Sequence, residues 1–381
     1  MADQPRYIVE RLNPDFGFFV RASRTLRSAQ TRHQHLEIVE SEEFGKVLLL
    51  DGVTQVASRH EFIYHEPMVH PALAAHPDPR EVLVIGGGDG GILRQVLRYR
   101  TVTKAVLAEL DEGVIAFCDK FLPEVNGGAF RDPRVRTEIG DGRAFVERTQ
   151  ERFDAVIMDM TDPFGPAAML YTREFFQAVK ARFRDSDGIF VMHTESPITR
   201  PRTFQQCLRT LGEVFRYRRT MTVFIPMYAV LWSITICSDS IDVAALTPAE
   251  IDTRLKERGV TGLDCYNGKT HQAMLTPMPF LKELFDDANA VSPITDAHPH
   301  FLDEIDLNSD GGLKITQASG DHPMPSTHAE PPTSDEYRQH PHPIPRGRAR
   351  SPAPDALHPD RRRPIPQPPG RATGRPPPLR P

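Results

Sequence analysis

Apolar runs alternate with amphipathic stretches through the middle of the chain. Short apolar runs such as Val82–Ile85 and Ala155–Met158 are typical of buried strands, and the stretches between them have helical periodicity. The pattern predicts strands at residues 81–86, 104–110, 135–139, 153–159, 188–194, 221–226 and 230–237, and helices at residues 90–99, 111–121, 142–150, 170–183 and 201–214. This alternation favours an α/β fold with a mostly parallel, doubly wound sheet. The last two strands are close in sequence and are expected to form an antiparallel hairpin at one edge.

The residues before this region have strand-like patterning. Residues 36–40 alternate between apolar and polar positions, and the runs 47–50 and 53–56 flank Asp51-Gly52, which favours a hairpin turn. Residues 57–75 then have a helical pattern. We therefore predict a small N-terminal β domain over residues 1–75, followed by a Rossmann-like domain over residues 76–310.

The composition changes sharply toward the C-terminus. The chain has 36 prolines, half of them after residue 320, and arginines crowd the end, as in Arg361–Arg363. Such a segment cannot bury enough apolar surface to offset its chain entropy. The sequence predicts a disordered tail over residues 311–381.

Composition and charge narrow the classes of function. The chain has 381 residues, 39% of them hydrophobic, and a formal net charge of -5, so it lacks the basic excess typical of nucleic-acid binding. No apolar run approaches the length of a transmembrane helix, and the first residues lack the apolar core of a signal peptide. The four cysteines are scattered, which favours reduced thiols over a disulfide or metal framework. We expect a cytoplasmic protein that binds neither nucleic acid nor membrane.

A glycine-rich turn, Gly86–Gly91, joins the first strand of the α/β region to its first helix. Gly86 and Gly88 belong to a Gly-x-Gly-x-x-Gly pattern, which favours a nucleotide or nucleoside at this turn. Asp89 lies inside the turn, where it would repel a pyrophosphate and hold a cation. The turn therefore argues against an NAD-dependent dehydrogenase.

Acidic residues also follow the next two predicted strands. Glu109 ends the second strand, where a carboxylate can accept hydrogen bonds from both ribose hydroxyls. Asp141 follows the third strand and can accept a hydrogen bond from an adenine amino group, while Gly142 allows close approach of the backbone. Because ligands of open α/β sheets bind at the carboxyl ends of the strands, these groups are expected to line one nucleoside site.

A second group of carboxylates follows the fourth strand. Asp159 ends that strand, and Asp162 lies in the turn that Pro163 and Gly165-Pro166 keep non-helical. Together with Asp89 they make three anions near one cleft, which favours a cationic ligand such as a polyamine. Magnesium is the rival ligand. The cleft lacks a metal-ligand histidine cluster, and we expect no metal there.

These residues together resemble the spermidine synthases, the polyamine aminopropyltransferases. The resemblance extends from about Gln34 to residue 287. The motifs that carry it, in order, are Leu50–Gln55, Glu61–Glu66, Gly86–Gly91, Asp132–Val135, Gly140–Arg143, Asp159–Pro166, Glu195–Pro197 and Tyr266-Asn267 with His271.

The resemblance implies a fold, an activity and a set of site residues. It implies a methyltransferase-like Rossmann domain with a small N-terminal β domain, assembled as a homodimer or homotetramer. It implies transfer of the aminopropyl group of decarboxylated S-adenosylmethionine, a co-substrate rather than a cofactor, to an amine, with release of 5'-methylthioadenosine. Asp159 would be the catalytic acid/base. The amine and aminopropyl groups would contact His65, Asp89, Asp162, Tyr64 and Tyr228, and the nucleoside would contact Gln34, Gly86, Gly88, Glu109, Asp141, Gly142 and Pro166.

The chain departs from the family pattern around the expected amine site. His60 stands where the family usually has an aspartate, and His193 replaces a common glutamine. The loop Ile225–Trp232 lacks the Pro-Ser-Gly of putrescine-using members. Putrescine is the default acceptor, with agmatine or a longer polyamine as the alternative. A methyltransferase and a non-catalytic polyamine-binding protein are the other readings. A methyltransferase does not explain Asp89 together with Asp159 and Asp162, and a binding protein would not need Asp159 beside a complete nucleoside pocket.

Overall fold

The computed structural model describes residues 6–163 and 165–300. All of the described residues belong to one compact unit. The predicted disordered tail over residues 311–381 lies outside the described residues, as do residues 301–310. The boundaries proposed for the two folded domains stay a prediction.

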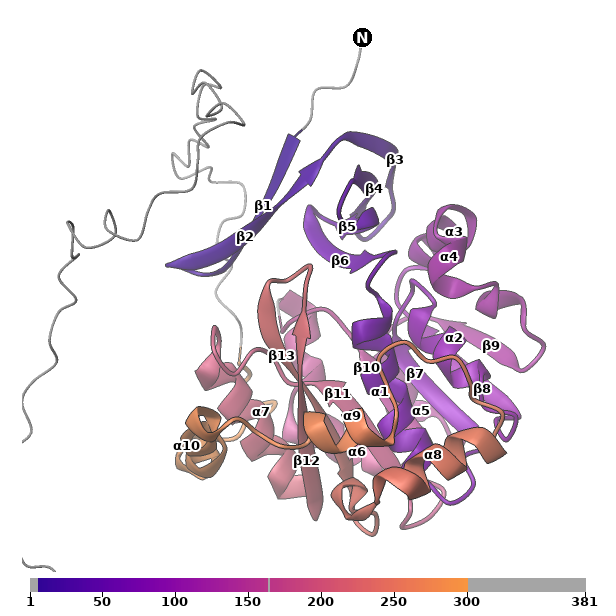
Figure 1. Cartoon of the computed structure of the whole chain (residues 1–381), viewed down its shortest axis with the longest axis vertical. Coiled ribbons are helices and arrows are strands. Elements are labelled where there is room, and N and C mark those ends of the chain that lie inside the picture. The colour runs from indigo at the N-terminus through magenta and orange to yellow at the C-terminus, as the bar shows by residue number, and fades with distance from the viewer. Residues whose placement is uncertain (1–5, 164, 301–381) are drawn as a thin grey trace, which may run out of the picture. The chain divides into compact units, whose positions relative to one another are not determined.

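A seven-stranded sheet forms the centre of the described part (Figure 1). Its strands, in spatial order, are β12 (Tyr217–Ile225), β13 (Val230–Ser238), β11 (Ile189–His193), β10 (Ala155–Asp159), β7 (Glu81–Gly86), β8 (Lys104–Glu109) and β9 (Val135–Ile139). β11, β10, β7, β8 and β9 run parallel, whereas β13 is antiparallel to β11 and to β12. The predictions of a mostly parallel sheet and of an antiparallel edge hairpin are confirmed.

The strand order reverses between β7 and β10. From β7 the chain continues to β8 and β9 on one side, and it then returns to place β10 and β11 on the other side. The connections at the carboxyl ends of β7 and β10 therefore diverge, and such a switch point is where open α/β sheets bind ligands. Asp159 is paired with Gly86 across this point, so the predicted catalytic carboxylate adjoins the glycine turn.

Helices cover both faces of the sheet, because alternate strand residues point to opposite sides. Val82 and Val84 of β7 pack in one core with side chains of α1 and α2, while Leu83 and Ile85 pack in a second core with side chains of α5, α6 and α7. The helices are α1 (Phe62–Ala75), α2 (Gly91–Leu97), α3 (Glu112–Phe121), α4 (Pro123–Asn126), α5 (Gly142–Arg148), α6 (Arg173–Lys180), α7 (Pro201–Val214), α8 (Pro248–Glu257), α9 (Gly268–Met274) and α10 (Lys282–Asp286). Within the described ranges, no helix is both long and apolar enough to cross a bilayer.

Two small antiparallel sheets precede the central sheet and lie beside its carboxyl edge (Figure 1). The first pairs β1 (Arg6–Asn13) with β2 (Phe16–Ala22). The second contains β3 (Arg24–Gln30), β4 (His35–Ser41), β5 (Gly45–Leu50) and β6 (Val53–Ala57). Asp51 and Gly52 both have positive φ, as the predicted Asp-Gly turn requires. The expected β character of this segment is confirmed, although the sequence pattern does not single out the β1–β2 hairpin.

Some element boundaries differ from the prediction. The helix expected over residues 57–75 begins only at Phe62, because the residues before it form a turn that brings the chain from β6 onto the central sheet. β12 begins at Tyr217 rather than at 221, because its first residues are paired with the end of β13. The prediction gives no element after residue 237. α8 nevertheless has a local signal, the capping box between Thr247 and Glu250 with Pro248 at the first turn.

Candidate active site

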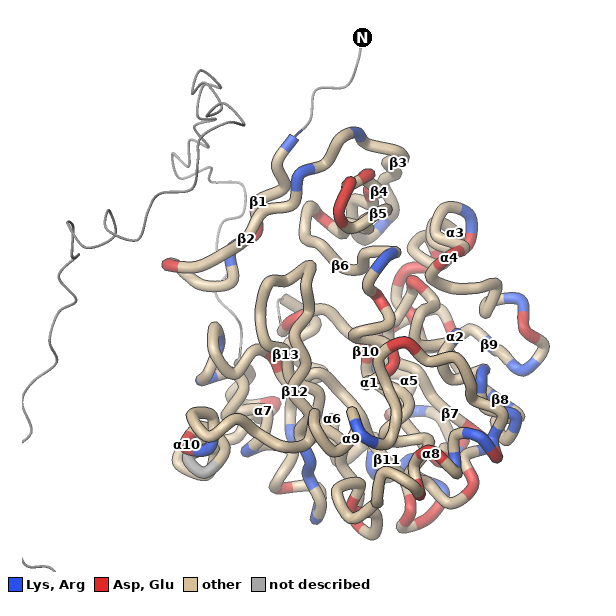
Figure 2. The backbone as a smooth tube through the Cα atoms, in the orientation of Figure 1, with Lys and Arg blue, Asp and Glu red and all other residues tan. Residues whose placement is uncertain are grey.

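A cavity of about 760 Å³ opens between the N-terminal sheets and the carboxyl ends of the central strands. The structure brings nearly all of the predicted site residues to its wall: Gln34, Tyr64, His65, Gly86, Gly88, Asp89, Glu109, Asp141, Gly142, Asp159, Asp162 and Tyr228. Pro166 lies in the short turn Gly165–Leu170, and its side chain is outside the described part. Figure 2 shows acidic segments of the backbone in the region between β6 and the central sheet.

The glycine turn is fixed to the end of β10. Gly86 has a φ of 75°, and a Cβ atom there would lie 2.2 Å from the carbonyl oxygen of Asp159. The N–H of Gly87 donates to that same oxygen at 2.9 Å. Glycine is thus required at this position, because only a residue without a side chain lets the two strand ends approach this closely.

Asp159 is positioned by a tyrosine from α1. The hydroxyl of Tyr64 donates to Oδ1 of Asp159 at 2.8 Å. Desolvation and the nearby Asp89 carboxylate raise the pKa of Asp159 to about 6, whereas the Tyr64 hydrogen bond acts in the opposite direction. Asp159 is therefore a stronger base than an ordinary aspartate and remains largely ionised at neutral pH.

Asp89 faces a histidine across the turn. Its Oδ1 accepts the N–H of Gly91 at 2.6 Å, and its Oδ2 lies 3.7 Å from Nε2 of His65. The His65 ring packs against the backbone of Gly91, where a Cβ atom would lie 2.1 Å from the ring. Although desolvation alone would raise the pKa of Asp89, the His65 imidazole holds it below its usual value. The carboxylate is thus ionised and partly balanced by a group of the protein itself.

The other predicted contacts of the nucleoside lie at the ends of β8 and β9. Glu109 is buried, which raises its pKa to about 7, and it accepts the N–H of Asp111 at 3.0 Å. Nε2 of Gln34 donates to Asp111 at 3.2 Å, so the N-terminal sheet is joined to this edge of the cavity. Asp141 caps α5 by accepting the N–H of Ala144 at 3.0 Å. These carboxylates are held in place by backbone amides before any ligand arrives.

The part of the cavity around Asp162 and Arg200, called its far end here, has a charge arrangement that the sequence does not reveal. Asp162 forms an ion pair with the buried Arg200. Nη1 of Arg200 also lies 3.0 Å from Oε2 of Glu195, and its Nε donates to the carbonyl oxygen of Leu12 at 3.0 Å. The negative charge of Asp162 is therefore shared with a fixed cation. The expected contact of Asp162 with an amine stays a prediction.

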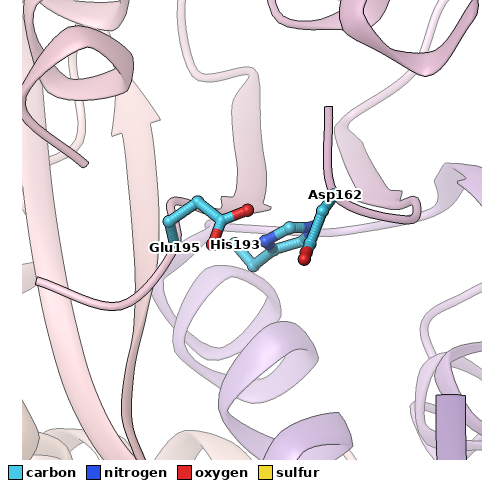
Figure 3. A group of neighbouring side chains, drawn as sticks. All are labelled: Asp162, His193 and Glu195. Carbon is cyan, nitrogen blue, oxygen red and sulfur yellow. The ribbon is translucent and has the colours of Figure 1, made fainter. Parts of the chain in front are cut away.

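Within the described part of the chain, one cluster of two carboxylates and a histidine has the spacing of a metal site. Ligand atoms of Asp162, His193 and Glu195 lie within 4.8 Å of one another, and Figure 3 shows the three side chains close together. The guanidinium of Arg200 already contacts both carboxylates, so a divalent cation would face a fixed positive charge. His193 is neutral, because burial lowers its pKa, and its Nε2 lies 2.9 Å from the carbonyl oxygen of Met160. The residues present fit a metal ion poorly.

Several charged residues of the cavity wall are not assigned to the site by the sequence analysis, among them Glu10, Glu61 and Arg200. Glu61 has a local signal, because it lies four residues before His65 at a helix start, and such pairs face each other. Glu10 and Arg200 have none. Glu10 accepts hydrogen bonds from the N–H and hydroxyl of Thr54, a partner that only the tertiary fold provides.

Comparisons with known proteins agree with this geometry. The chain matches the family model described as the spermine/spermidine synthase domain over residues 61–246, and the one described as the spermidine synthase tetramerisation domain over residues 7–58. It is similar to the polyamine aminopropyltransferase of Nitrosomonas europaea, with 41% identity over 313 residues that cover 82% of this chain and 95% of the relative. The polyamine aminopropyltransferase of Bacillus subtilis is 38% identical over 241 residues, which cover 63% of this chain and 87% of the relative.

Solved structures give the same answer. Spermidine synthase from Thermotoga maritima superposes with a TM-score of 0.68 at 34% identity, covering 75% of this chain and 96% of that one. A spermidine synthase in complex with the transition state analogue AdoDATO superposes with a TM-score of 0.69 at 34% identity, covering 75% of this chain and 97% of that one. The fold, the cavity and these similarities lead to one conclusion: the chain belongs to the spermine/spermidine synthase family.

Proposed function

We propose that this enzyme, an aminopropyltransferase, transfers the aminopropyl group of decarboxylated S-adenosylmethionine to putrescine and releases spermidine and 5'-methylthioadenosine. One observation carries the proposal. Asp159, hydrogen-bonded by Tyr64, opens on the same cavity as the glycine turn, Asp89 and Glu109. A nucleoside bound along Glu109 would thus present its sulfonium close to the carboxylate that receives the amine.

The donor side of the reaction requires little of the protein beyond binding. A sulfonium is already an activated leaving group, so the proposed reaction needs neither a cofactor nor a covalent intermediate. Glu109, Gln34 and Asp141 would bind the nucleoside. Asp89 would face the ammonium of the decarboxylated donor, and it would repel the carboxylate of ordinary S-adenosylmethionine.

The acceptor side depends on removal of a proton. A free alkylamine has a pKa of about 10.4, well above that of any ordinary carboxylate. Its ammonium becomes more acidic when it is desolvated beside a sulfonium, and Asp159, with its pKa raised to about 6, is a better base than a solvated aspartate. The amine lone pair then attacks the carbon next to sulfur, the C–S bond breaks, and its electrons remain on the thioether.

The far end of the cavity is the part that selects the acceptor. Glu10 and Asp162 line it, and a second ammonium of a diamine would face them. Arg200 already neutralises part of this charge, which disfavours an acceptor that brings more than one further cation. This balance supports putrescine over a longer polyamine.

The proposal includes assembly. The match of residues 7–58 to a tetramerisation domain supports a homotetramer, with the N-terminal strands at the contacts.

The deciding assay incubates the protein with decarboxylated S-adenosylmethionine and a panel of putrescine, agmatine and spermidine, and identifies the products by mass. We expect spermidine and 5'-methylthioadenosine in equal amounts, with putrescine the preferred acceptor. A preference for agmatine or spermidine would refute the acceptor assignment. Methyl transfer from ordinary S-adenosylmethionine without aminopropyl transfer would refute the reaction.

The variant Asp159→Asn tests the proposed base. The amide is nearly isosteric but cannot accept the amine proton, so kcat should fall by about 10²–10⁴-fold. The affinity for 5'-methylthioadenosine, measured by calorimetry, should change little. Near-normal turnover in this variant would show that another group takes the proton.

A further inference from the structure

The imidazole of His65 is held between two carboxylates. Its Nδ1 lies 2.5 Å from Oε2 of Glu61, and its Nε2 lies 3.7 Å from Oδ2 of Asp89. The His65 and Glu61 side chains are almost completely buried, with 2% and 7% of their surface exposed. An imidazole with an anion at each nitrogen is stabilised in its doubly protonated form. The ring also lies close to Gly91, where a Cβ atom would lie 2.1 Å from it.

The charges around this ring come from several elements. Glu61 precedes α1, Asp89 lies in the turn after β7, and Asp159 ends β10, so three carboxylates surround the site. Arg94 of α2 is the guanidinium on this side, and it contacts the second oxygen of Glu61 at 2.5 Å. Tyr64, the residue before His65, donates its hydroxyl to Asp159 and is neutral. Three carboxylates and one guanidinium give the site a net negative charge, which favours another cation there.

We propose that His65 is a built-in counter-cation of the empty amine site, which gives up its proton when the cationic substrates enter, and that Glu61 is the positioning residue that maintains this state. This proposal rests on the proposed function, because it requires that the cavity binds substrates with an ammonium and a sulfonium. It extends that function by assigning a role to Glu61 and a proton to the binding step.

The proton on His65 has a clear origin and destination. Burial alone would lower the pKa of His65, but Asp89 and Glu61 together raise it to about 10, so the ring of the empty site is an imidazolium at neutral pH. An ammonium placed at Asp89 takes over the same carboxylate and repels the imidazolium. The Nε2–H proton then leaves to solvent, while Nδ1–H continues to donate to Glu61. The neutral ring presents the lone pair of Nε2 to the bound amine.

This exchange predicts a pH dependence of amine binding. Below the pKa of His65 the imidazolium and the ammonium compete for Asp89. Amine affinity should therefore rise with pH between 7 and 9, by up to about tenfold per pH unit. The rise ends near pH 10, where the ring itself loses its proton, and an ordinary alkylammonium loses its own at about pH 10.4, the value for lysine.

The experiment counts protons on the full chain. Putrescine is titrated into the complex with 5'-methylthioadenosine at pH 8, by calorimetry in buffers of different ionisation enthalpy. We expect release of about one proton per site. NMR of protein with isotopically labelled histidine, with the His65 signal assigned from a His65→Gln variant, should show that this ring changes from imidazolium to imidazole on binding.

Two variants move the His65 titration in opposite directions. Glu61→Gln keeps an acceptor for Nδ1–H but removes the charge, so the titration midpoint of His65 should fall and less proton should be released. Arg94→Met removes the second cation that contacts Glu61, so the titration midpoint of His65 should rise. Asp78→Asn is the matched control, because it removes an exposed ion-paired carboxylate that contacts Arg80. It should change neither the midpoint nor the proton count.

The outcomes separate this inference from the proposed function. Three results would overturn the inference. They are putrescine binding without proton release, proton release while the His65 signal stays that of an imidazolium, and equal proton counts in wild type and Glu61→Gln. In those cases the aminopropyl-transfer assay would still give spermidine. Absence of both putrescine binding and spermidine formation would overturn the proposed function and this inference with it.

Discussion

The hydroxyl of Tyr64 comes from α1 rather than from a strand end, and it makes the Asp159 carboxylate less basic. It donates to Asp159 at 2.8 Å, and this hydrogen bond lowers the pKa that desolvation and Asp89 raise. A base acts only when ionised, so the acid side of the kcat/KM profile should follow this pKa.

The variant Tyr64→Phe removes that hydrogen bond and should raise the pKa of Asp159. A hydrogen bond to a charged group contributes about 1.5–3 kcal/mol, so the acid limb of kcat/KM should move upward by about one to two pH units. The loss of activity should be larger at pH 6 than at pH 9, as measured in a full pH–rate profile. Tyr228→Phe is the control, because the Tyr228 hydroxyl donates to the carbonyl oxygen of Gln55. A loss that is uniform across pH in Tyr64→Phe would mean that the hydroxyl acts only in packing or binding.

Single residues of the site differ in how far the sequence predicts them. Asp89, Glu109 and Asp159 could be predicted, because acidic residues that end successive parallel strands meet at one edge of the sheet. Glu10 and Arg200 could not, because their roles depend on contacts between residues more than 40 positions apart. The pairing of Asp162 with Arg200 is the consequence that sequence reasoning missed.

At the scale of elements, the β1–β2 hairpin is held over the cavity by the segment before α7. Nε of Arg200 donates to the carbonyl oxygen of Leu12, and Nδ2 of Asn13 donates to the carbonyl oxygen of Thr199 at 3.2 Å. The same Arg200 contacts Glu195, which has a φ of 70°. A non-glycine residue in this region is strained, and such strain is typical of functional sites.

The variant Arg200→Met leaves Asp162 and Glu195 without their cation. Breaking a buried ion pair by removing one partner costs about 3–5 kcal/mol of the free energy of unfolding. Burial raises the pKa of Glu195 to about 8, above its unfolded value of 4.5, so its contribution to stability is full below pH 4.5 and is lost as the pH rises through 8. Without Arg200 the ionised form is costlier still, and the loss should therefore be larger at pH 9 than at pH 6.

Urea unfolding at both pH values measures this difference. Arg24→Met is the control, because Arg24 and Glu40 form an exposed pair, with 58% and 42% of their side-chain surface accessible. It should cost less than about 1 kcal/mol at either pH. An equal loss at pH 6 and pH 9 in Arg200→Met would indicate lost packing rather than unpaired charge.

Secondary-structure elements, like single residues, differ in how far the sequence predicts them. The strands from β7 to β11 and the longer helices between them could be predicted from their hydrophobic period, whereas the short helix α4 was not predicted. The start of α1 could not, because Glu61 and His60 are compatible with a helix and only the turn from β6 decides where it begins. The early start of β12 depends likewise on its partner strand.

At the scale of the whole molecule, the β1–β2 hairpin has two different faces. Successive residues of a strand point to opposite sides, so Ile8, Glu10 and Leu12 turn inward, while Val9 turns outward and is 37% exposed. On β2, Phe19 is 58% exposed and packs edge-on against Tyr7, with ring centroids 5.3 Å apart. The inner face thus contributes Glu10 and Leu12 to the cavity wall, and the outer face has the exposed apolar side chains Val9 and Phe19 beside the exposed Arg21. Only the family resemblance predicted assembly, because hydrophobic periodicity alone does not show which apolar face another chain covers.

The variant Phe19→Glu places a charge on that outer face and should weaken the proposed tetramer. Size-exclusion chromatography with light scattering, over a range of protein concentrations, should show smaller species than the wild type. Because Glu10 and Leu12 of the same hairpin line the far end of the cavity, loss of the contact should raise KM for the amine more than it changes affinity for 5'-methylthioadenosine. Phe224→Glu, which charges a residue of β12 with a similar exposed fraction of 55%, is the matched control and should leave the assembly intact. An unchanged mass for Phe19→Glu would place the contacts between chains elsewhere, whereas a smaller mass with unchanged amine KM would show that the hairpin holds its position over the cavity without a partner.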